Sequence, residues 1–404
     1  MKKTLAASAL TVGMLAVPLA GSALADPTDT YPATYNGSGS DTTEVVMRAL
    51  DGKITGLGSW DIQGGSDVPW DTNGTDPGCS FIKRPTGSGQ GRTALANSVT
   101  KGDNCLQYAR SSSRSNGVVA GTITGMGSGD GTAGDYTAST GSTVVPMLPI
   151  TLATDGLTYV FRALSGTPRD LTLGQLRAIY HCNFGSSASP VIVDGRLMSS
   201  NSIPNQPLLP ADASGSRSDW LKLMANDSSD IAAYTAGTGE VASDPSGNLP
   251  ACIDDGPGDS PATEFSEHNG SVLTNGRQII LHSTAQWIAQ GRSATGDARG
   301  LAQLGYINGN TVLAALNNAA GVLDPSTVSG STITDGAYFR PVYNVLPTAL
   351  VGDSNAQAVF GTRAGGTTTT SAGTNGVNDI PGTDSGAICV NDATIQDFGF
   401  LPVC

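Results

Sequence analysis

The sequence predicts an α/β fold with largely parallel sheets, because segments typical of strands and segments typical of helices alternate along it. Residues 43–50 carry apolar side chains at helical spacing, whereas residues 142–152 (STVVPMLPITL) include a β-rich run. The length of 404 residues suits two domains of moderate size.

Local patterning places the individual elements. We expect helices at residues 43–50, 93–99, 171–180, 218–225, 283–290 and 312–320. We expect strands within residues 142–152 and at 157–163, 277–282, 337–345 and 349–351. At 171–180, Thr172 is a candidate N-cap, and Leu173, Leu176 and Ile179 share one helix face. Residues 361–386 are rich in Gly, Thr and Ser, which indicates a surface loop without a core of its own.

The N-terminus has the pattern of a secretory signal peptide. Lys2 and Lys3 precede an apolar run from Leu5 to Ala20, and Ala23-Leu24-Ala25 is a small-x-small cleavage site. A buried N-terminal helix is the alternative. We expect cleavage after Ala25 and a secreted mature chain with no membrane insertion, because no second apolar run reaches spanning length. No cysteine stands directly after the cleavage site, so we expect no lipid anchor.

The cysteines fit an exported protein. They form an even, well-spaced set without a CxxC pair, which is typical of disulfides in an oxidising compartment. Six cysteines allow about fifteen pairings, and a zinc site is less favoured because zinc cysteines usually come as close pairs. We expect pairing between sequence neighbours: Cys79–Cys105, Cys182–Cys252 and Cys389–Cys404.

The charge balance limits the classes of partner. A net charge of −13 argues against nucleic acid and anionic membranes. It does not argue against a small anionic ligand, because a buried anion responds to nearby donors and helix ends more than to distant, screened charge.

Three loops share one composition, and each precedes a predicted helix. They are residues 37–43 (GSGSDTT), 87–92 (GSGQGR) and 214–218 (SGSRS). The first turn of a helix offers unpaired N–H groups, glycine lets a ligand approach the backbone, and hydroxyls add donors that rotate. Ordinary helix capping explains any one of these loops equally well, but their recurrence favours an oxyanion site.

A fourth segment, residues 108–115 (YARSSSRS), places two arginines among serines. Arginine forms bidentate, charge-assisted bonds to oxyanions. A solvated basic loop is the alternative reading of this segment.

In this order the segments resemble the PstS-like phosphate-binding proteins of ABC importers, a group of type II periplasmic binding proteins. The resemblance spans residues 35 to about 318. It is carried by NGSGSDTT near the start, by Gly87–Gly91, by Ser112-Ser113-Arg114, by LTLGQLRAIYHCNF and by Ser214–Arg217.

The resemblance implies a two-lobe type II periplasmic-binding-protein fold, in which each lobe has a mixed sheet flanked by helices and the ligand lies in a cleft between the lobes. The expected lobes are residues 26–150, residues 151–335 and a return to the first lobe at 336–404. It implies an oxyanion site made by Ser40, Asp41, Thr42, Ser88, Gly89, Ser113, Arg114, Ser214, Gly215, Ser216 and Arg217.

The function that the resemblance implies is capture of a small tetrahedral oxyanion, inorganic phosphate first, for uptake by an ABC permease. We expect a monomer with no cofactor, no metal and no catalytic residue. Two alternatives remain: a secreted phosphate-ester hydrolase, and an extracellular protein without a transport role. The sequence lacks HExxH and GxSxG motifs, and His181, His268 and His282 are isolated from one another, which does not favour an enzyme.

Overall fold

The computed structural model describes part of the chain, and the statements below concern that part. Several sequence predictions lie outside it: the leader, Cys79, Cys404, Arg114, the helix at 312–320 and residues 362–385 of the low-complexity segment. The described residues are 33–60, 67–68, 82–83, 85, 87–113, 117–119, 144–162, 170–199, 205–210, 214–224, 252–254, 265, 268–292, 302–307, 339–361 and 386–402.

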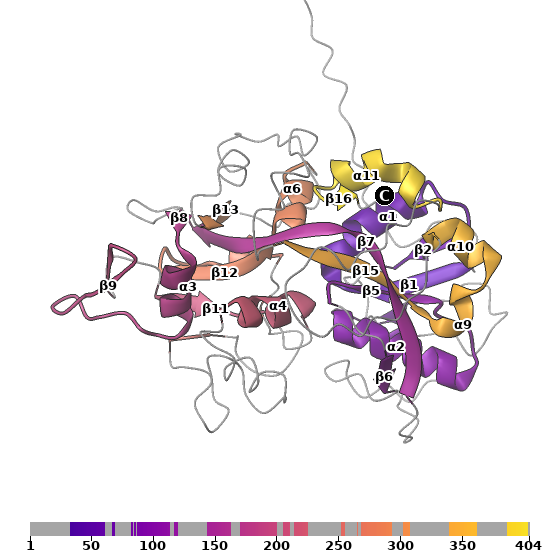
Figure 1. Cartoon of the computed structure of the whole chain (residues 1–404), viewed down its shortest axis with the longest axis horizontal. Coiled ribbons are helices and arrows are strands. Elements are labelled where there is room, and N and C mark those ends of the chain that lie inside the picture. Colours follow the sequence, from indigo (N-terminus) through magenta and orange to yellow (C-terminus); the bar gives the residue numbers. More distant parts are fainter. Residues whose placement is uncertain are drawn as a thin grey trace, which may run out of the picture.

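One mixed sheet organises these residues (Figure 1). Its strand order is β11-β12-β7-β15-β5-β1-β2, and β6, β13 and β16 also pair with β7. The main strands are β1 (Tyr35–Gly39), β2 (Leu57–Ser59), β5 (Tyr108–Ser111), β7 (Val144–Arg162), β11 (Gln206–Leu208), β12 (Gln278–Ser283) and β15 (Phe339–Pro347). The shorter strands on β7 are β6 (Gly117–Val119), β13 (Ala302–Leu304) and β16 (Leu401–Pro402).

The sheet confirms the α/β class and the mixed sheets that the resemblance implies, but it corrects the expectation of largely parallel strands. The pairs β1–β2, β1–β5 and β11–β12 are parallel and lie at the two ends of the strand order. The pairs β5–β15, β15–β7 and β7–β12 between them are antiparallel. The alternation of strands and helices along the sequence predicted the parallel pairs at the two ends of the sheet. It does not predict the antiparallel strands β7 and β15 in the middle of the sheet.

Among the described residues, apolar side chains pack on this sheet in four clusters, and β7 contributes to each of them. We call the two largest the first and the second core. Leu152 and Ala153 belong to the first core, together with Val46, Met47 and Leu50 of α1 (Glu44–Asp51). Further along β7, Tyr159 and Phe161 belong to the second core. The second core also receives side chains from α3 (Leu173–Tyr180), α4 (Gly215–Met224) and β12. The two cores form the two ends of the molecule in Figure 1, joined by β7 and β15. The predicted lobe boundaries stay a prediction, and the one at residue 150 falls within β7.

A local signal explains where α3 begins. Thr172 accepts a hydrogen bond from the Gln175 N–H, and Gln175 bonds back to the Thr172 N–H, which is a capping box. The cap predicted from the sequence is therefore confirmed. Helix α2 (Ser88–Lys101) begins five residues earlier than predicted, because its Gly/Ser-rich first turn has no apolar pattern. The remaining helices of the main fold are α6 (Thr284–Arg292), α9 (Thr348–Val351), α10 (Ser354–Phe360) and α11 (Asp392–Asp397).

The predicted strand at 349–351 is wrong, because these residues form the helical turn α9. A three-residue apolar run does not distinguish a strand from a helical turn. Here Pro347, with φ fixed at −58°, precedes the turn and ends β15. The two strands predicted from 142 to 163 are one continuous strand, β7.

The disulfide Cys182–Cys252 is confirmed, with a Cα–Cα distance of 5.8 Å. It joins the C-terminal end of α3 to the segment that pairs with Leu208 of β11. Cys105 is also disulfide-bonded. No described helix combines the length and the apolar character needed to span a membrane.

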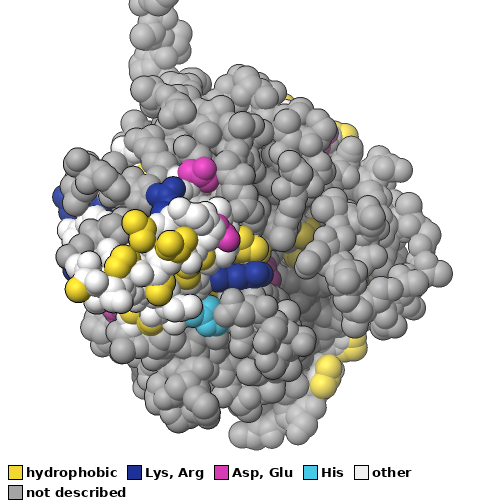
Figure 2. Space-filling model, turned by 60° about the vertical axis from the view of Figure 1, so that its left-hand side comes forward, with side chains coloured by type: hydrophobic (Ala, Val, Ile, Leu, Met, Phe, Trp, Pro, Cys, Tyr) yellow, Lys and Arg dark blue, Asp and Glu magenta, His cyan; other side chains and the backbone are white. Residues whose placement is uncertain are grey.

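A hairpin of β9 (Val191–Val193) and β10 (Arg196–Met198) extends from the second core. Ile192 and Leu197 face each other across it and remain 71% and 57% exposed. Figure 2, turned to bring this side of the molecule forward, shows hydrophobic side chains at the surface there.

One close backbone approach fixes α2 against the end of β1. A Cβ placed on Gly91 of α2 would lie 2.6 Å from the Gly39 Cα and 3.0 Å from the Ser38 carbonyl oxygen. Both neighbours are backbone atoms, so neither yields by a side-chain rotation. Glycine at position 91 therefore lets the start of α2 lie directly on the end of β1.

We predict that Gly91→Ala lowers the free energy of unfolding by about 2 kcal/mol, because overpacking outweighs the gain in helix propensity. Denaturant unfolding measures the change. The control is Gly52→Ala, since φ is −64° at Gly52 and the nearest atom lies 3.9 Å from its built Cβ. Equal stability of Gly91→Ala and Gly52→Ala would contradict the close approach.

Candidate functional site

Polar loops gather where parallel strands end. Residues 40–43 follow β1, and Ser112 and Ser113 follow the neighbouring strand β5. In the second core, α4 follows β11 and α6 follows β12, which is its parallel neighbour. Carboxyl ends of parallel strands are where ligands bind in open α/β sheets. The four loops of these two strand pairs make the candidate site.

The two cores meet through hydroxyl groups at the start of α2 and α4. The Ser88 and Ser112 Oγ atoms lie 3.0 Å apart. A Cβ on Gly215 would lie 2.4 Å from the Ser112 Oγ and 2.7 Å from the Ser88 Oγ. Because only glycine allows this approach, the first turn of α4 reaches the hydroxyls of the first core with its backbone. Ser88 is the first residue of α2, so the positive end of this helix also lies at this point.

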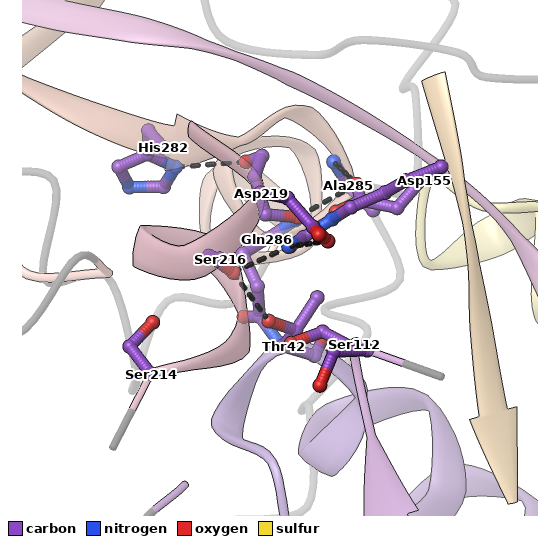
Figure 3. Close-up of polar contacts among 12 residues, drawn as sticks. Thr42, Ser112, Asp155, Ser214, Ser216, Asp219, His282, Ala285 and Gln286 are labelled. Carbon is purple, nitrogen blue, oxygen red and sulfur yellow. Dashed lines mark hydrogen bonds and ion pairs between the residues drawn. The ribbon is translucent and has the colours of Figure 1, made fainter. Parts of the chain in front are cut away.

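A second contact between the cores lies beside the first. The Thr42 Oγ1 is 3.2 Å from the Ser216 Oγ, and both side chains are fully buried. The Ser216 Oγ also accepts a hydrogen bond from Nη2 of Arg340 in β15. Figure 3 shows Thr42, Ser112 and Ser216 close together, with Asp155, Asp219 and Gln286 beside them.

Several of these hydroxyls already accept an N–H bond. Ser88 Oγ accepts from the Ser112 N–H at 2.9 Å, and Ser216 Oγ accepts from Arg340. Ser113 Oγ accepts from Nη1 of Arg92 at 3.0 Å. A hydroxyl has one hydrogen and two lone pairs, so an oxygen that has accepted an N–H still donates its own hydrogen. Each of the three hydroxyls therefore keeps its hydrogen to donate, and the hydrogens of Ser88 and Ser216 can also reach the hydroxyls of Ser112 and Thr42.

Arg340 is nearly buried, and two carboxylates balance its charge. Nη2 lies 3.2 Å from Asp155 Oδ2, and Nη1 lies 3.3 Å from Asp219 Oδ2. Asp155 and Arg340 are direct partners in the β7–β15 ladder. Burial raises the pKa of the Asp155 carboxyl, although Arg340, the Ser283 hydroxyl and the Ala285 N–H act in the opposite direction. Burial also lowers the pKa of the Arg92 guanidinium, which the charge of Asp219 opposes.

Asp41 connects the first loop to the second half of the chain. Its Oδ2 lies 3.0 Å from Nδ1 of His268, and its Oδ1 accepts the Thr42 N–H at 2.9 Å. Burial alone would raise the pKa of this carboxyl, but His268, the Thr42 N–H and Arg340 together hold it below the ordinary aspartate value. His268 packs edge-on against His282, with ring centroids 5.4 Å apart.

A buried arginine holds the first loop in place through hydrogen bonds. Arg110, at the end of β5, donates to the carbonyl oxygens of Gly39, Ser40 and Trp60 and to the Ser59 hydroxyl. These bonds turn the carbonyls of residues 39 and 40 toward Arg110. The Ser40 hydroxyl is buried and has no hydrogen-bond partner among the described residues. It remains able to donate to a ligand.

The structure brings most of the predicted site residues together. Ser40, Asp41, Thr42, Ser88, Ser113, Gly215 and Ser216 all belong to the contacts above, and Gly89 lies in the first turn of α2. The Ser214 hydroxyl accepts the Arg217 N–H at 3.1 Å, and Nη1 of Arg217 donates to the Pro210 carbonyl at 2.6 Å. Ligand roles for all these residues stay a prediction, and Arg114 lies outside the described residues.

Sequence reasoning missed Asp155, Gln286 and Arg340. A weak signal existed for two of them, because Asp155 and Arg340 are charged residues within apolar strand runs. The sequence carries no signal for Gln286, because glutamine is common in amphipathic helices. Among the described residues, no group of three or more His, Cys, Asp or Glu side chains is placed to hold a metal ion.

Comparison with known proteins finds likeness in structure alone. No protein-family model matches the chain, and no curated protein matches it. The ancestral soluble variant of the human phosphate-binding protein is 12% identical, with a TM-score of 0.43 over 92% of this chain and 91% of that one. The phosphate-binding protein from Stenotrophomonas maltophilia is 13% identical, with a TM-score of 0.41 over 92% and 91% of the two chains. An ABC-type phosphate transport receptor from Vibrio cholerae is 13% identical, with a TM-score of 0.34 over 78% and 87%. These likenesses are distant, so the functional conclusion rests on the residues of this chain.

We predict that Asp41→Asn lowers the free energy of unfolding by about 2 kcal/mol at about pH 5, the size of a hydrogen bond to a charged group. The pKa of Asp41 is lower in the folded protein than in the unfolded chain. Its contribution is therefore complete above the unfolded value of about 3.9 and is lost as the pH falls through the folded value.

The difference between Asp41→Asn and the wild type should shrink at about pH 3. Denaturant unfolding at the two pH values measures it. His268→Gln is the matched variant, because it removes the largest of the effects that lower this pKa and should reduce the acid-dependent loss. A difference of equal size at both pH values would contradict the assignment.

Proposed function

We propose that this protein is an exported solute-binding protein without catalytic activity that captures a small tetrahedral oxyanion, inorganic phosphate first. The observation that carries the proposal is the set of hydroxyl donors contributed by both cores. Ser88 and Ser113 come from the first core, and Ser216 comes from the second. An anion that accepts hydrogen bonds from both sides would hold the two cores together.

The direction of the hydrogen bonds favours an acceptor ligand. Hydroxyls that already accept an N–H offer hydrogens, and so do the first turns of α2 and α4. An ammonium group has no acceptor, so it would leave these donors unpaired at a cost of about 1–3 kcal/mol each. A sugar hydroxyl accepts, but it brings a hydrogen of its own that needs an acceptor in the site. An unprotonated oxygen on a tetrahedral anion satisfies the donors of the site.

The charge of the site has a consequence for selectivity. The two carboxylates of Asp155 and Asp219 face the guanidiniums of Arg340 and Arg92, so attraction by net charge contributes little. Binding must come from correctly placed donors, which favours a tetrahedral oxyanion over chloride or a carboxylate. Micromolar affinity requires about −8 kcal/mol, and hydrogen bonds to a charged group contribute roughly 1.5–3 kcal/mol each. About six such bonds are enough after the cost of ordering the site.

The transport role rests on the sequence. The leader at residues 1–25 supports export, and the resemblance to phosphate-binding proteins of ABC importers supports delivery to a permease. We propose that the mature chain acts outside the cytoplasm and passes its anion to such a transporter.

We predict that phosphate raises the melting temperature of the mature protein and that sugars and amino acids do not. A ligand at a hundredfold excess over its dissociation constant adds about 2.7 kcal/mol of stability. Thermal melting with phosphate, arsenate, sulfate, molybdate, a sugar and an amino acid measures this. Absence of a shift with every oxyanion would rule out the proposed function.

Paired serine variants locate the binding. Ser216→Ala should weaken oxyanion binding about tenfold or more, because the variant removes the hydroxyl that Arg340 holds in place. Ser98→Ala is the control, since Ser98 is equally buried but bonds Asp103 and the Leu106 N–H away from the site. Equal losses of affinity in the two variants would place the binding elsewhere.

A further inference from the structure

Resting on the proposed function, we propose that Gln286 is a positioning residue for the oxyanion site. Its side-chain amide would hold two carbonyl oxygens of the first loop away from the anion. Gln286 lies in α6 and is 3% exposed. Nε2 donates to the Asp41 carbonyl at 2.9 Å and to the Thr42 carbonyl at 2.7 Å.

Helix α6 packs against the first core and against a smaller apolar cluster that includes Ile280 of β12. Ala285 packs in the first core, whereas Trp287 and Ile288 pack with residues of β12 on the other side. Gln286 thus reaches the first loop from a helix that belongs to the second half of the chain. Its two bonds join the loop to α6 just where Thr42 meets Ser216.

A hydrogen-bond chain fixes the orientation of α6 behind the amide. The Gln286 N–H donates to the Ser283 hydroxyl at 3.1 Å, and that hydroxyl donates to Asp155 Oδ1 at 2.8 Å. The other oxygen of Asp155 bonds Arg340, which in turn holds Ser216. Arg340, which donates to the Ser216 hydroxyl, and Gln286, which donates to the carbonyls of the first loop, therefore belong to one hydrogen-bond network.

The chemistry of the loop explains why two carbonyls need an amide. Carbonyl oxygens carry partial negative charge, so lone pairs that face an oxyanion would repel it. The Asp41 carbonyl also accepts the Glu44 N–H, and the Gln286 amide engages the same oxygen from a second side. Only the NH₂ end of the amide suits two carbonyl acceptors, which settles how Gln286 is turned. With both oxygens engaged, the loop presents to the site the hydroxyl of Thr42 rather than its backbone acceptors.

The same helix offers a matched control. Gln290 lies one turn further along α6, is 8% exposed, and donates from Nε2 to the His268 carbonyl at 2.7 Å. It thus makes the same kind of bond as Gln286 from the same helix, to a carbonyl outside the first loop.

The test compares Gln286→Met, Gln286→Glu and Gln290→Met with the wild type by calorimetric titration with phosphate and by melting without ligand. Gln286→Met should raise the phosphate dissociation constant about tenfold, the factor that two hydrogen bonds of ordinary net strength support. Gln290→Met should bind phosphate within about twofold of the wild type while losing a similar amount of thermal stability.

Gln286→Glu separates positioning from packing, because it keeps the shape of the side chain and reverses the chemistry. A carboxylate facing two carbonyls should weaken binding more than methionine does at neutral pH. Binding should recover as acid protonates the carboxyl and restores one donor, and Gln286→Met should show no such recovery. If Gln286→Met does not fold, this pH profile carries the test alone.

The outcomes are distinguishable. A wild type that binds no oxyanion overturns the proposed function and this inference with it. A wild type that binds phosphate overturns the inference alone in either of two cases: Gln286→Met binds equally well, or Gln290→Met loses as much affinity. The inference is also overturned if Gln286→Glu binds phosphate better than Gln286→Met at neutral pH. That result is expected if Gln286 acts only through packing, because glutamate keeps its shape.

Discussion

The pairing of β7 with β15 is the constraint on which the rest of the structure depends. Both strands pass through the junction of the two cores, and their register makes Arg340 and Asp155 direct partners. A slip of one residue would turn Arg340 to the opposite face of the sheet. Arg340 would then lose Ser216 and Asp219, and α4 would lose its link to the crossing strands.

The site follows from that ladder. The parallel strands at the two ends of the sheet direct their carboxyl ends, and the loops after them, toward the junction. Arg340 donates to the Ser216 hydroxyl in the second core. In the first core, the Ser112 N–H donates to the Ser88 hydroxyl, and Arg92 donates to the Ser113 hydroxyl. The carboxylates on Arg340 remove its net attraction for anions, so geometry rather than charge would select the ligand.

Local chemistry made part of this predictable. The capping box at Thr172 and the Gly/Ser loops before α2 and α4 are written in adjacent residues, so the sequence identified them. The start of α2 was placed too late because its glycines serve a close approach to Gly39 rather than an apolar face. The sequence did not reveal the partners of Arg340, because Asp155 lies 185 residues away and only the strand register brings them together. Gln286 was hidden for the same reason, since its acceptors lie more than 240 residues earlier in the chain.

The most direct test of the account is a crystal structure of the mature protein with phosphate. The account predicts an anion at the junction of the two cores, with its oxygens within hydrogen-bond distance of the hydroxyls of Ser88, Ser113 and Ser216. It also predicts that the Gln286 amide still bonds the carbonyls of Asp41 and Thr42. Phosphate bound elsewhere, or at the junction with these hydroxyls turned away from it, would contradict the central claim.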